Sequence, residues 1–326
     1  MTASTKERLG LLVREQRLTV VPGAANALTT RIIEEAGFES AYVSGAAISN
    51  LFLGSPDIGL TSLTEVAAHV AAIRDACTIP LIIDADTGFG NAVNTWRTVR
   101  VLERAGADAI QLEDQSYPKR CGHFSGKSVV SSAEMVDKIS AAREARTDPG
   151  LLIIARTDAR AEHGLGEACR RALAYHQAGA DVLFVEAPQT VDEVEAIARE
   201  LPGPLVHNVV EGGVTPEIPL ARIAELGYSV ALFANLSLLA GIRATRDVLA
   251  YLRQGSIGPR PRVASWTERQ DLVRKPWFDE LADRFDSAAP IPDAHPDVST
   301  PSLRQPMRKH HDVGLPDSVQ PGKAAQ

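Results

Sequence analysis

The chain repeats one unit about eight times: a short apolar run, a polar turn and a longer amphipathic segment. The apolar runs, such as Leu81-Ile82-Ile83, have the composition of strands buried on both faces, which is typical of parallel sheets. A glycine often separates an amphipathic segment from the next run, as at Gly106 and Gly179. Glycine favours the left-handed turn that ends a helix. This alternation predicts a parallel sheet covered by helices.

Eight strands and several helices can be placed from this pattern. The strands are expected at residues 18–22, 40–44, 80–84, 108–113, 151–156, 181–186, 204–208 and 229–233, and helices at 63–76, 92–105, 133–145, 165–178 and 191–201. Eight strand–helix units predict an α/β fold of the (β/α)8, or TIM, barrel type. A doubly wound sheet is the weaker alternative, because its first strand usually leads into a glycine-rich phosphate turn. Here the chain reads Pro22-Gly23-Ala24-Ala25.

The sequence divides into three regions. Residues 1–260 contain the eight units and form the predicted barrel. Residues 261–287 form a further helical region with an amphipathic segment left over after those units. Seven prolines interrupt the polar stretch 288–326. We expect this tail to be disordered, because it cannot bury enough apolar surface to offset its ordering entropy.

The totals exclude several classes of protein. A formal net charge of −7 over 326 residues argues against a nucleic-acid-binding surface. No apolar run is long enough to span a bilayer, so we expect no membrane partner, and the polar N-terminus does not resemble a secretory signal. The three cysteines are too few and too scattered for a disulfide framework, which favours a cytoplasmic protein.

Polar side chains stand where the expected strands end. In chain order they are Ser44 with Gly45 and Ala46, Asp84 with Asp86, Glu113 with Asp114, Arg156, Glu186, and Asn208 followed by Glu211. The active site of a (β/α)8 barrel lies at this end of the strands. A buried charge is unfavourable unless it is paired or binds a metal. The series therefore predicts a functional site and not a requirement of folding.

Asp84 and Asp86 form the most specific pair in this series. Two residues apart on an extended strand, their carboxylates lie on the same side and repel each other. A divalent cation relieves that repulsion, and Mg²⁺ takes one or two protein carboxylates together with water and substrate oxygens. Two aspartates that cap a strand-to-loop turn are the alternative. Glu113 and Arg156 on neighbouring strands favour the metal site.

Cys121 lies in a polar, glycine-flanked loop within Lys119-Arg120-Cys121-Gly122-His123. Neighbouring cations lower the pKa of a thiol and make it a useful proton donor or acceptor near neutral pH. A buried, inert thiol is the alternative, but the polar loop disfavours it. His123 can be a proton donor, a substrate ligand or a surface residue. His207 precedes Asn208 on a strand and should point to the opposite face.

These motifs together resemble the isocitrate lyase/phosphoenolpyruvate mutase superfamily over about residues 5–285. The resemblance is carried by Val43-Ser44-Gly45, Gly54-Ser55-Pro56-Asp57, Asp84-Ala85-Asp86-Thr87-Gly88-Phe89-Gly90, Gln111-Leu112-Glu113-Asp114-Gln115, Lys119-Arg120-Cys121-Gly122-His123, Ala155-Arg156-Thr157-Asp158-Ala159 and Asn208-Val209-Val210-Glu211-Gly212-Gly213. Several independent motifs in the same order make the match specific. The tail after residue 288 lies outside it.

The resemblance implies an assembly, a metal and a set of site residues. Members of this superfamily form homotetramers, as dimers of dimers, in which a C-terminal helix, here within 261–287, packs on a neighbouring subunit. They bind Mg²⁺, for which Mn²⁺ can substitute. The implied metal site is Asp84 and Asp86, with Asp57 and Glu113 holding metal-bound waters. The implied substrate contacts are Ser44, Gly45, Ala46, Gly122, Arg156, Asn208 and Glu211, and the implied catalytic residues are Lys119, Cys121, His123, Arg156 and Glu186, with Cys121 transferring a proton from a mobile loop.

The implied activity is Mg²⁺-dependent cleavage of a carbon–carbon bond by a lyase or hydrolase. Its substrate would be a small 2-hydroxy or 2-oxo dicarboxylate such as a 2-alkylmalate, and it would release an α-keto acid or oxalate. A phosphonomutase acting on carboxyphosphonoenolpyruvate or phosphoenolpyruvate is one alternative, because one mutase branch shares the Lys-Arg-Cys-Gly-His loop. A 2-methylisocitrate lyase is another.

The segment after the last strand bears on the choice of substrate. Methylisocitrate lyases usually have an arginine there, which holds an extra substrate carboxylate. In this chain the corresponding stretch, 235–240, is largely apolar, and Asn235 replaces a proline that is common at its position in the superfamily. These differences favour a substrate smaller than a tricarboxylate.

Overall fold

The computed structural model describes residues 3–15, 17–120, 126 and 128–286. The chain separates into two compact units, residues 1–276 and residues 277–326, and each is described by itself. Cys121, Gly122, His123 and the tail 288–326 lie outside the described residues, so the expectations about them stay predictions.

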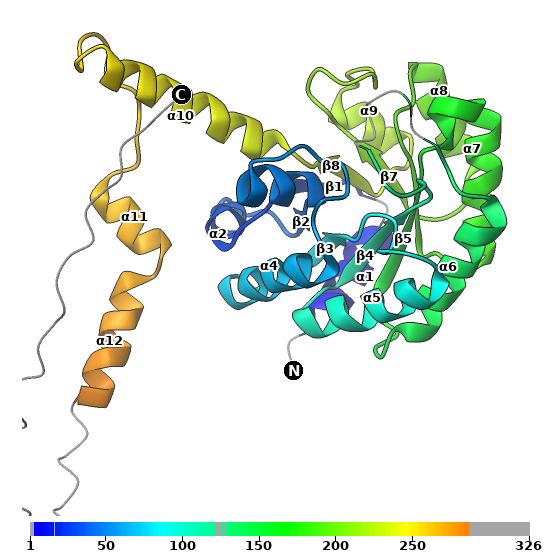
Figure 1. Ribbon diagram of the computed structural model, residues 1–326, viewed down its shortest axis with the longest axis horizontal. Helices are drawn as coiled ribbons and strands as arrows, with labels where there is room; N and C mark the ends of the chain where they lie inside the picture. The colour runs from blue at the N-terminus through cyan, green and yellow to red at the C-terminus, as the bar shows by residue number, and fades with distance from the viewer. Residues whose placement is uncertain (1–2, 16, 121–125, 127, 287–326) are drawn as a thin grey trace, which may run out of the picture. The chain divides into compact units, whose positions relative to one another are not determined.

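Eight parallel strands close into a barrel in the first unit (Figure 1). They are β1 (Thr19–Ala24), β2 (Ala41–Val43), β3 (Leu81–Asp84), β4 (Ala109–Glu113), β5 (Leu152–Thr157), β6 (Val182–Val185), β7 (Leu205–Asn208) and β8 (Val230–Phe233). Each strand pairs with its neighbour in sequence, and β1 pairs with β8, where Thr19 lies opposite Val230. The predicted (β/α)8 barrel is confirmed, and closure excludes the doubly wound sheet.

Helices follow the strands in sequence and lie around the barrel, except for α10, which extends away from it (Figure 1). They are α2 (Ala27–Glu35), α3 (Gly45–Ile48), the π-helix η1 (Ser49–Leu53), α4 (Leu63–Ala76), α5 (Ala92–Ala105), α6 (Ser132–Ala145), α7 (Ala159–Gln177), α8 (Val191–Glu200), α9 (Leu220–Glu225) and α10 (Leu236–Arg253). α7 begins earlier than expected because a short helical segment precedes Gly164, where a φ of 79° interrupts the helix with a kink. Only the part after this kink shows the amphipathic pattern in the sequence.

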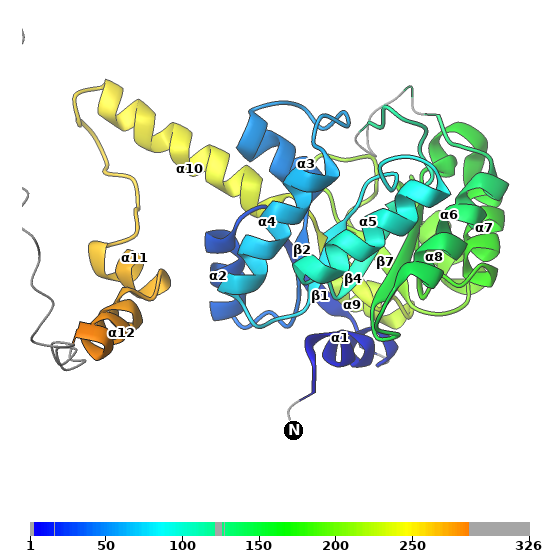
Figure 2. The same cartoon turned by 60° about the horizontal axis from the view of Figure 1, so that its bottom comes forward.

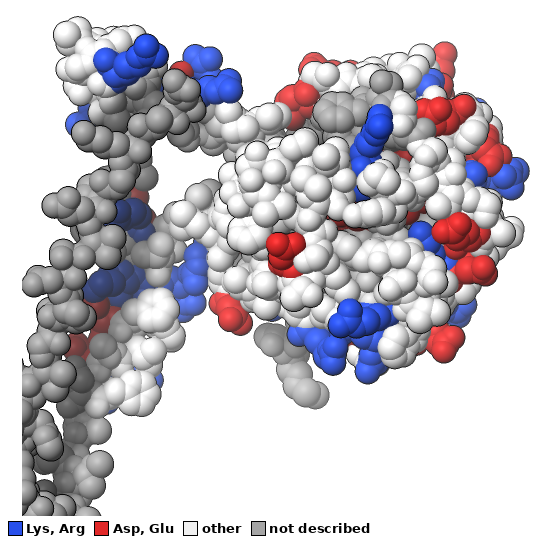
Figure 3. Space-filling model, viewed as in Figure 1, with Lys and Arg blue, Asp and Glu red and all other residues white. Residues whose placement is uncertain are grey.

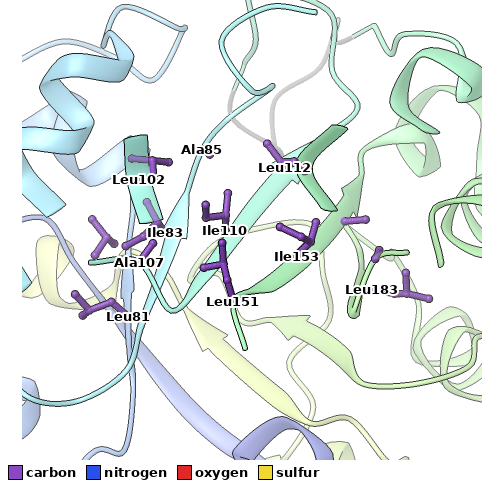
Figure 4. Close-up of a cluster of buried hydrophobic side chains, with 14 of the residues drawn as sticks. Leu81, Ile83, Ala85, Leu102, Ala107, Ile110, Leu112, Leu151, Ile153 and Leu183 are labelled. Atoms are coloured by element: carbon purple, nitrogen blue, oxygen red, sulfur yellow. The ribbon is translucent and has the colours of Figure 1, made fainter. Parts of the chain in front are cut away.

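Side-chain alternation along the strands divides the core into two layers. Leu81 and Ile83 point outward and pack beneath the helices, in the buried cluster drawn in part in Figure 4. Ile82 between them points inward and joins Tyr42, Phe184 and residues from other strands inside the barrel. Every second side chain along a strand points into the barrel. The last of these inward side chains therefore face the opening of the barrel at the carboxyl end of the strands.

The helix α1 (Thr5–Arg14) covers the opposite end of the barrel (Figure 2). Ser4 and Glu7 form a capping box that satisfies the first backbone N–H groups of the helix. Leu9 and Val13 pack into the inward-facing core. The sequence pattern did not single out this helix, because its polar residues dominate so short a segment.

The predicted helical region after the barrel contains α11 (Trp266–Leu272) and α12 (Lys275–Asp286). None of the side chains of α10 is buried, although it carries several large apolar residues. Among the described residues no helix is both long and apolar enough to cross a bilayer. On the face shown in Figure 3, acidic and basic side chains are interspersed without a continuous basic field, in agreement with the negative net charge.

Candidate active site

A small cavity of about 60 Å³ opens at the carboxyl end of the strands. Its lining residues are Tyr42, Ser44, Ala46, Asp57, Asp84, Glu113, Lys119, Arg120, Arg156, Glu186, Asn208, Val210, Leu232, Ala234 and Asn235. Asp84, Arg156 and Asn208 each come two residues after an inward-facing core residue. Strand periodicity therefore explains why side chains far apart in the sequence converge here.

Ser44 and Gly45 bring backbone close to the two aspartates. Ser44 caps the short helix α3 by accepting a hydrogen bond from the N–H of Ala47 at 3.2 Å. The N–H of Gly45 donates to Asp84 Oδ2 at 3.1 Å. A Cβ at position 45 would lie only 3.2 Å from oxygens of both Asp84 and Asp86. Glycine thus allows the backbone to approach both carboxylates closely.

Lys119 places a positive charge among these carboxylates. Its Nζ lies 2.6 Å from Asp86 Oδ1 and also contacts Asp57. Burial raises the pKa of Asp86, and Lys119 opposes that rise. Burial also disfavours the ammonium, yet Asp86 and Glu113 raise the pKa of Lys119 well above its usual value. We take Lys119 to be charged at neutral pH, because its Nζ lies between two carboxylates.

The donor atoms suit a hard divalent cation. Glu113 Oε1 and Asn208 Oδ1 are buried and accept no hydrogen bond from the described residues, and Asp86 Oδ1 is buried against the ammonium group of Lys119. Oxygen atoms of this kind are the ligands that Mg²⁺ prefers. No three His, Cys, Asp or Glu side chains in the described part of the chain enclose an ion by themselves. Mg²⁺ uses few protein ligands and keeps several waters.

Arg156 is the second buried cation that lines the cavity. Its Nε and Nη2 donate to the two carboxylate oxygens of Asp158 at 2.8 and 3.0 Å. Its Nη1 lies 3.3 Å from Glu186 Oε2. Burial opposes the charge, but Asp158 and Glu186 hold the pKa of Arg156 well above its usual value. The bidentate contact fixes the plane of the guanidinium group.

Glu186 and Asn208 form a second polar contact at the mouth of the barrel. Asn208 Nδ2 donates to both carboxylate oxygens of Glu186 at 3.3 Å. This orientation leaves Asn208 Oδ1 without a hydrogen bond from the described residues. His207 points to the outer layer, as expected, where its ring packs edge-on against Tyr228 at 5.5 Å between centroids.

Most of the predicted site residues that the structure describes are brought together. Gly45 and Asp86 do not line the cavity themselves but contact Asp84 and Lys119, which do. Glu211 is exposed in the loop after β7 and is not among the described residues that line the cavity. Its predicted contact with substrate stays untested. Cys121, Gly122 and His123 lie outside the described residues, although Lys119 and Arg120 just before them line the cavity.

Sequence reasoning did not select Tyr42 and Asn235, which also line the cavity. Tyr42 lies two residues before Ser44, so strand periodicity could have indicated it. Burial raises the pKa of Tyr42 well above its usual value, and its phenol stays protonated at neutral pH. Asn235 precedes α10 but makes no side-chain cap. Instead, its Oδ1 accepts a hydrogen bond from Ser44 Oγ at 3.1 Å.

A larger cavity of about 570 Å³ lies at the other end of the barrel, beside α1. Its lining includes Arg14, Glu15, Arg17 and Glu225, which are surface residues around Tyr228 and Ser229. It has no counterpart to the buried carboxylates of the smaller cavity. Chemistry and not size therefore identifies the site, and catalytic groups of (β/α)8 barrels lie at the carboxyl end of the strands.

Fold and site together define a (β/α)8-barrel enzyme with buried carboxylates and two buried cations at the carboxyl end of its strands. Residues 9–253 match the phosphoenolpyruvate phosphomutase family, and the chain belongs to this family. The chain is 42% identical to 2,3-dimethylmalate lyase of Eubacterium barkeri over 272 residues, which cover 83% of this chain and 94% of that protein. The predicted superfamily is confirmed, and the chain is an enzyme of its lyase class.

Two solved structures are similar throughout the barrel. Oxaloacetate acetylhydrolase in complex with 3,3-difluorooxalacetate has a TM-score of 0.83 and 32% identity, covering 88% of this chain and 98% of that one. Phosphonopyruvate hydrolase in complex with oxalate and Mg²⁺ has a TM-score of 0.78 and 32% identity, covering 87% and 100%. By their names, the first enzyme acts on oxaloacetate and the second on phosphonopyruvate.

Proposed function

We propose that the protein is a Mg²⁺-dependent carbon–carbon lyase or hydrolase that acts on a small 2-hydroxy or 2-oxo dicarboxylate, such as a 2-alkylmalate. The observation that carries this proposal is that Asp84 and Arg156 line one cavity, with Asp86 beside Asp84 at the backbone of Gly45. Carboxylates that suit a divalent cation then share the cavity with a fixed guanidinium group. A substrate with a carboxylate next to a hydroxyl or carbonyl group satisfies both.

The site residues divide the work of cleavage. Bound Mg²⁺ would be held by Asp84 and Asp86 and would supply Lewis-acid stabilisation of oxygen charge. Arg156 stabilises negative charge that develops on the substrate, since its guanidinium is already oriented before substrate binds. The backbone at Gly45 and the side chain of Asn208 orient the substrate. Cys121 donates the proton that the leaving fragment needs.

The wall formed by β8 favours a small substrate with an alkyl group. Leu232 and Ala234 line the cavity on this side, together with Val210 from the loop after β7. Among the described residues, the cations that line the cavity are Lys119, Arg120 and Arg156. The β8 wall thus offers apolar contacts and an amide at Asn235, but no cation for an additional carboxylate. This supports a substrate smaller than 2-methylisocitrate.

A panel of substrates tests the proposal directly. The protein is incubated with Mg²⁺ and 2-alkylmalates, oxaloacetate or 2-methylisocitrate, and the release of an α-keto acid or oxalate is measured. We expect turnover of a 2-alkylmalate or oxaloacetate that is abolished by a chelator. A parallel ³¹P NMR experiment with phosphoenolpyruvate detects any phosphorus–carbon bond. Formation of that bond without turnover of the panel would identify a phosphonomutase and overturn the proposal.

We also propose a homotetramer, as a dimer of dimers. In its support, Leu239 and Ile242 of α10 are 43% and 40% exposed, and Leu249 and Leu252 are 58% and 56% exposed. A contiguous apolar helix face is a typical subunit contact. Light scattering coupled to size-exclusion chromatography should give about four times the chain mass of 34.9 kDa. A monomeric mass would contradict this assembly.

A further inference from the structure

Asp114 is a fully buried carboxylate that the proposed chemistry does not use. It directly follows Glu113 at the end of β4 and is 0% exposed. A buried carboxylate is strongly unfavourable unless several donors surround it. The donors around Asp114 come from two parts of the chain, the end of β5 and the helix α7.

The helix α7 supplies two donors to the same oxygen of Asp114. Tyr175, also fully buried, donates its phenol O–H to Oδ2 at 2.8 Å. Arg171 donates Nη1 to Oδ2 at 3.2 Å, and its Nε is held by Glu167 at 2.8 Å. Tyr175 and Arg171 lie four residues apart, so they occupy one face of the helix.

The end of β5 supplies the other donors. Thr157 Oγ1 donates to Asp114 Oδ2 at 2.7 Å, and the backbone N–H of Asp158 donates to Oδ1 at 2.9 Å. The side chain of Asp158 then holds Arg156 through two hydrogen bonds. Two residues therefore connect α7 to the guanidinium group in the site: Asp114, and Asp158 through both its backbone and its side chain.

The same cluster also ties down one stem of the loop that follows β4. Val130, which precedes α6, donates its N–H to the backbone oxygen of Asp114 at 2.8 Å. Its own carbonyl oxygen accepts from Arg171 Nη1 at 2.8 Å. A cluster needed only to neutralise Asp114 would not require both of these contacts. Their presence links the ends of β4 and β5 to one rigid helix.

We propose that Tyr175 and Arg171 of α7 are positioning residues for Arg156, acting through Asp114 and Asp158. This inference rests on the proposed function only in naming Arg156 as the group that stabilises substrate charge. Among the described residues, Tyr175 does not line the cavity, and its phenol bonds to Asp114, which does not line it either. Its effect on catalysis should therefore pass through the orientation of Arg156.

The variant Tyr175→Phe tests the inference, because it removes one hydroxyl and leaves the buried ring in place. Tyr228→Phe is the matched control: it also removes a buried phenol, whose O–H donates to the carbonyl of Val194 at 3.0 Å, remote from Arg156. Misplaced catalytic groups lose rate steeply, so we expect kcat/KM to fall about tenfold in Tyr175→Phe. Tyr228→Phe should change kcat/KM by less than about twofold, although the two variants should have similar thermal midpoints.

A double-mutant cycle with Arg156→Lys separates positioning from general stability. If Tyr175 acts through Arg156, adding Tyr175→Phe to Arg156→Lys should lower kcat/KM no further. Additive losses, or equal losses in the two tyrosine variants, would overturn the inference. If Tyr175→Phe fails to fold, Thr157→Val takes its place, since it removes another donor to Asp114 without changing side-chain volume.

A measurement without substrate keeps this inference distinct from the proposed function. In protein labelled with ¹⁵N-arginine, Arg156→Lys identifies the Nε–H resonance of Arg156. Its hydrogen exchange should accelerate in Tyr175→Phe and stay unchanged in Tyr228→Phe. If exchange accelerates but no substrate is turned over, only the proposed function is contradicted. If exchange of the Arg156 Nε–H is unchanged in Tyr175→Phe, only the positioning role is contradicted.

Discussion

The ammonium Nζ of Lys119 lies 2.6 Å from Asp86 Oδ1, inside the cluster of carboxylates that suits a divalent cation. Lys119 comes from the loop after β4, whereas Asp86 follows β3, so the contact joins two neighbouring strand ends. Lys119 and a divalent cation would neutralise the same carboxylates. The stability of the protein and its response to Mg²⁺ should therefore depend on each other through this residue.

Lys119→Gln should destabilise the metal-free protein, because the buried Asp86 and the partly buried Asp57 lose their cation. We expect the free energy of unfolding to fall by about 3 kcal/mol, as when one partner of a buried ion pair is removed. Saturating Mg²⁺ should then raise the thermal midpoint of the variant more than that of the wild type. Lys6→Gln is the control, since Lys6 also lies between two carboxylates, Glu103 and Asp148, outside this site. Equal Mg²⁺ responses in all three proteins would contradict the prediction.

Cys121→Ser should lower kcat by at least about a hundredfold, because a hydroxyl group is a far weaker acid than a thiol and general acid catalysis is lost. Cys77→Ser, directly after α4, and Cys169→Ser, within α7, are matched controls at buried positions, and both should keep most of their activity. Burial raises the pKa of Cys169 to about 11, so its thiol stays protonated and unreactive. Iodoacetamide should accordingly label Cys121 first, as read by mass spectrometry. Faster labelling of Cys77 or Cys169 would argue against an activated Cys121.

His207 should make the protein less stable in acid. Burial lowers its pKa from 6.5 to about 4, and the nearby Glu186 only partly offsets this. In the unfolded chain His207 is protonated below about pH 6.5, whereas in the folded protein it is protonated only below about pH 4. Stability is full above pH 6.5 and falls by about 3 kcal/mol as the pH drops through this window.

His207→Asn should remove this part of the pH dependence, which denaturant unfolding at several pH values measures. The exposed residue His163 provides the control variant, His163→Asn. The prediction would be refuted if the difference in the free energy of unfolding between wild type and His207→Asn were the same at pH 7 and at pH 4.

Gly23→Ala should be strongly destabilising, because a Cβ at this position in β1 would overlap the backbone carbonyl of Ala234. We expect a loss of more than about 2 kcal/mol, since backbone on both sides must shift. Gly10→Ala in α1 is the opposite case: its Cβ would meet nothing closer than 3.9 Å. It should stabilise the helix by up to about 1 kcal/mol. Chemical denaturation of both variants measures these opposite changes in the free energy of unfolding. An unchanged free energy of unfolding in Gly23→Ala would contradict the close approach of β1 to the chain after β8.

The barrel could be predicted from the sequence because each strand–helix unit carries its own local signals. Buried runs such as Leu81-Ile82-Ile83 and the glycines that end helices act within a few residues of each other. The series from Asp84 to Asn208 was predictable for the same reason. Once parallel strands are assumed, their carboxyl ends must meet at one end of the sheet.

The contacts made by those residues depend on strand register and helix placement, which no local pattern encodes. Asp114 seemed to be one more carboxylate beside Glu113, but it points away from the cavity and binds Tyr175, 61 residues later. Alternation along β4 explains the difference, since adjacent residues face opposite sides. Asn235 likewise meets Ser44 across 191 residues only because the barrel closes between β1 and β8.

The sequence by itself therefore determined the fold class, the family and most of the residues at the mouth of the barrel. Those properties follow from periodicity and from short motifs in a fixed order. Only the tertiary structure decided which charges pair, such as Lys119 with Asp86 and Arg156 with Asp158. Pairing depends on distances of a few ångströms between strands, and closure of the barrel sets those distances.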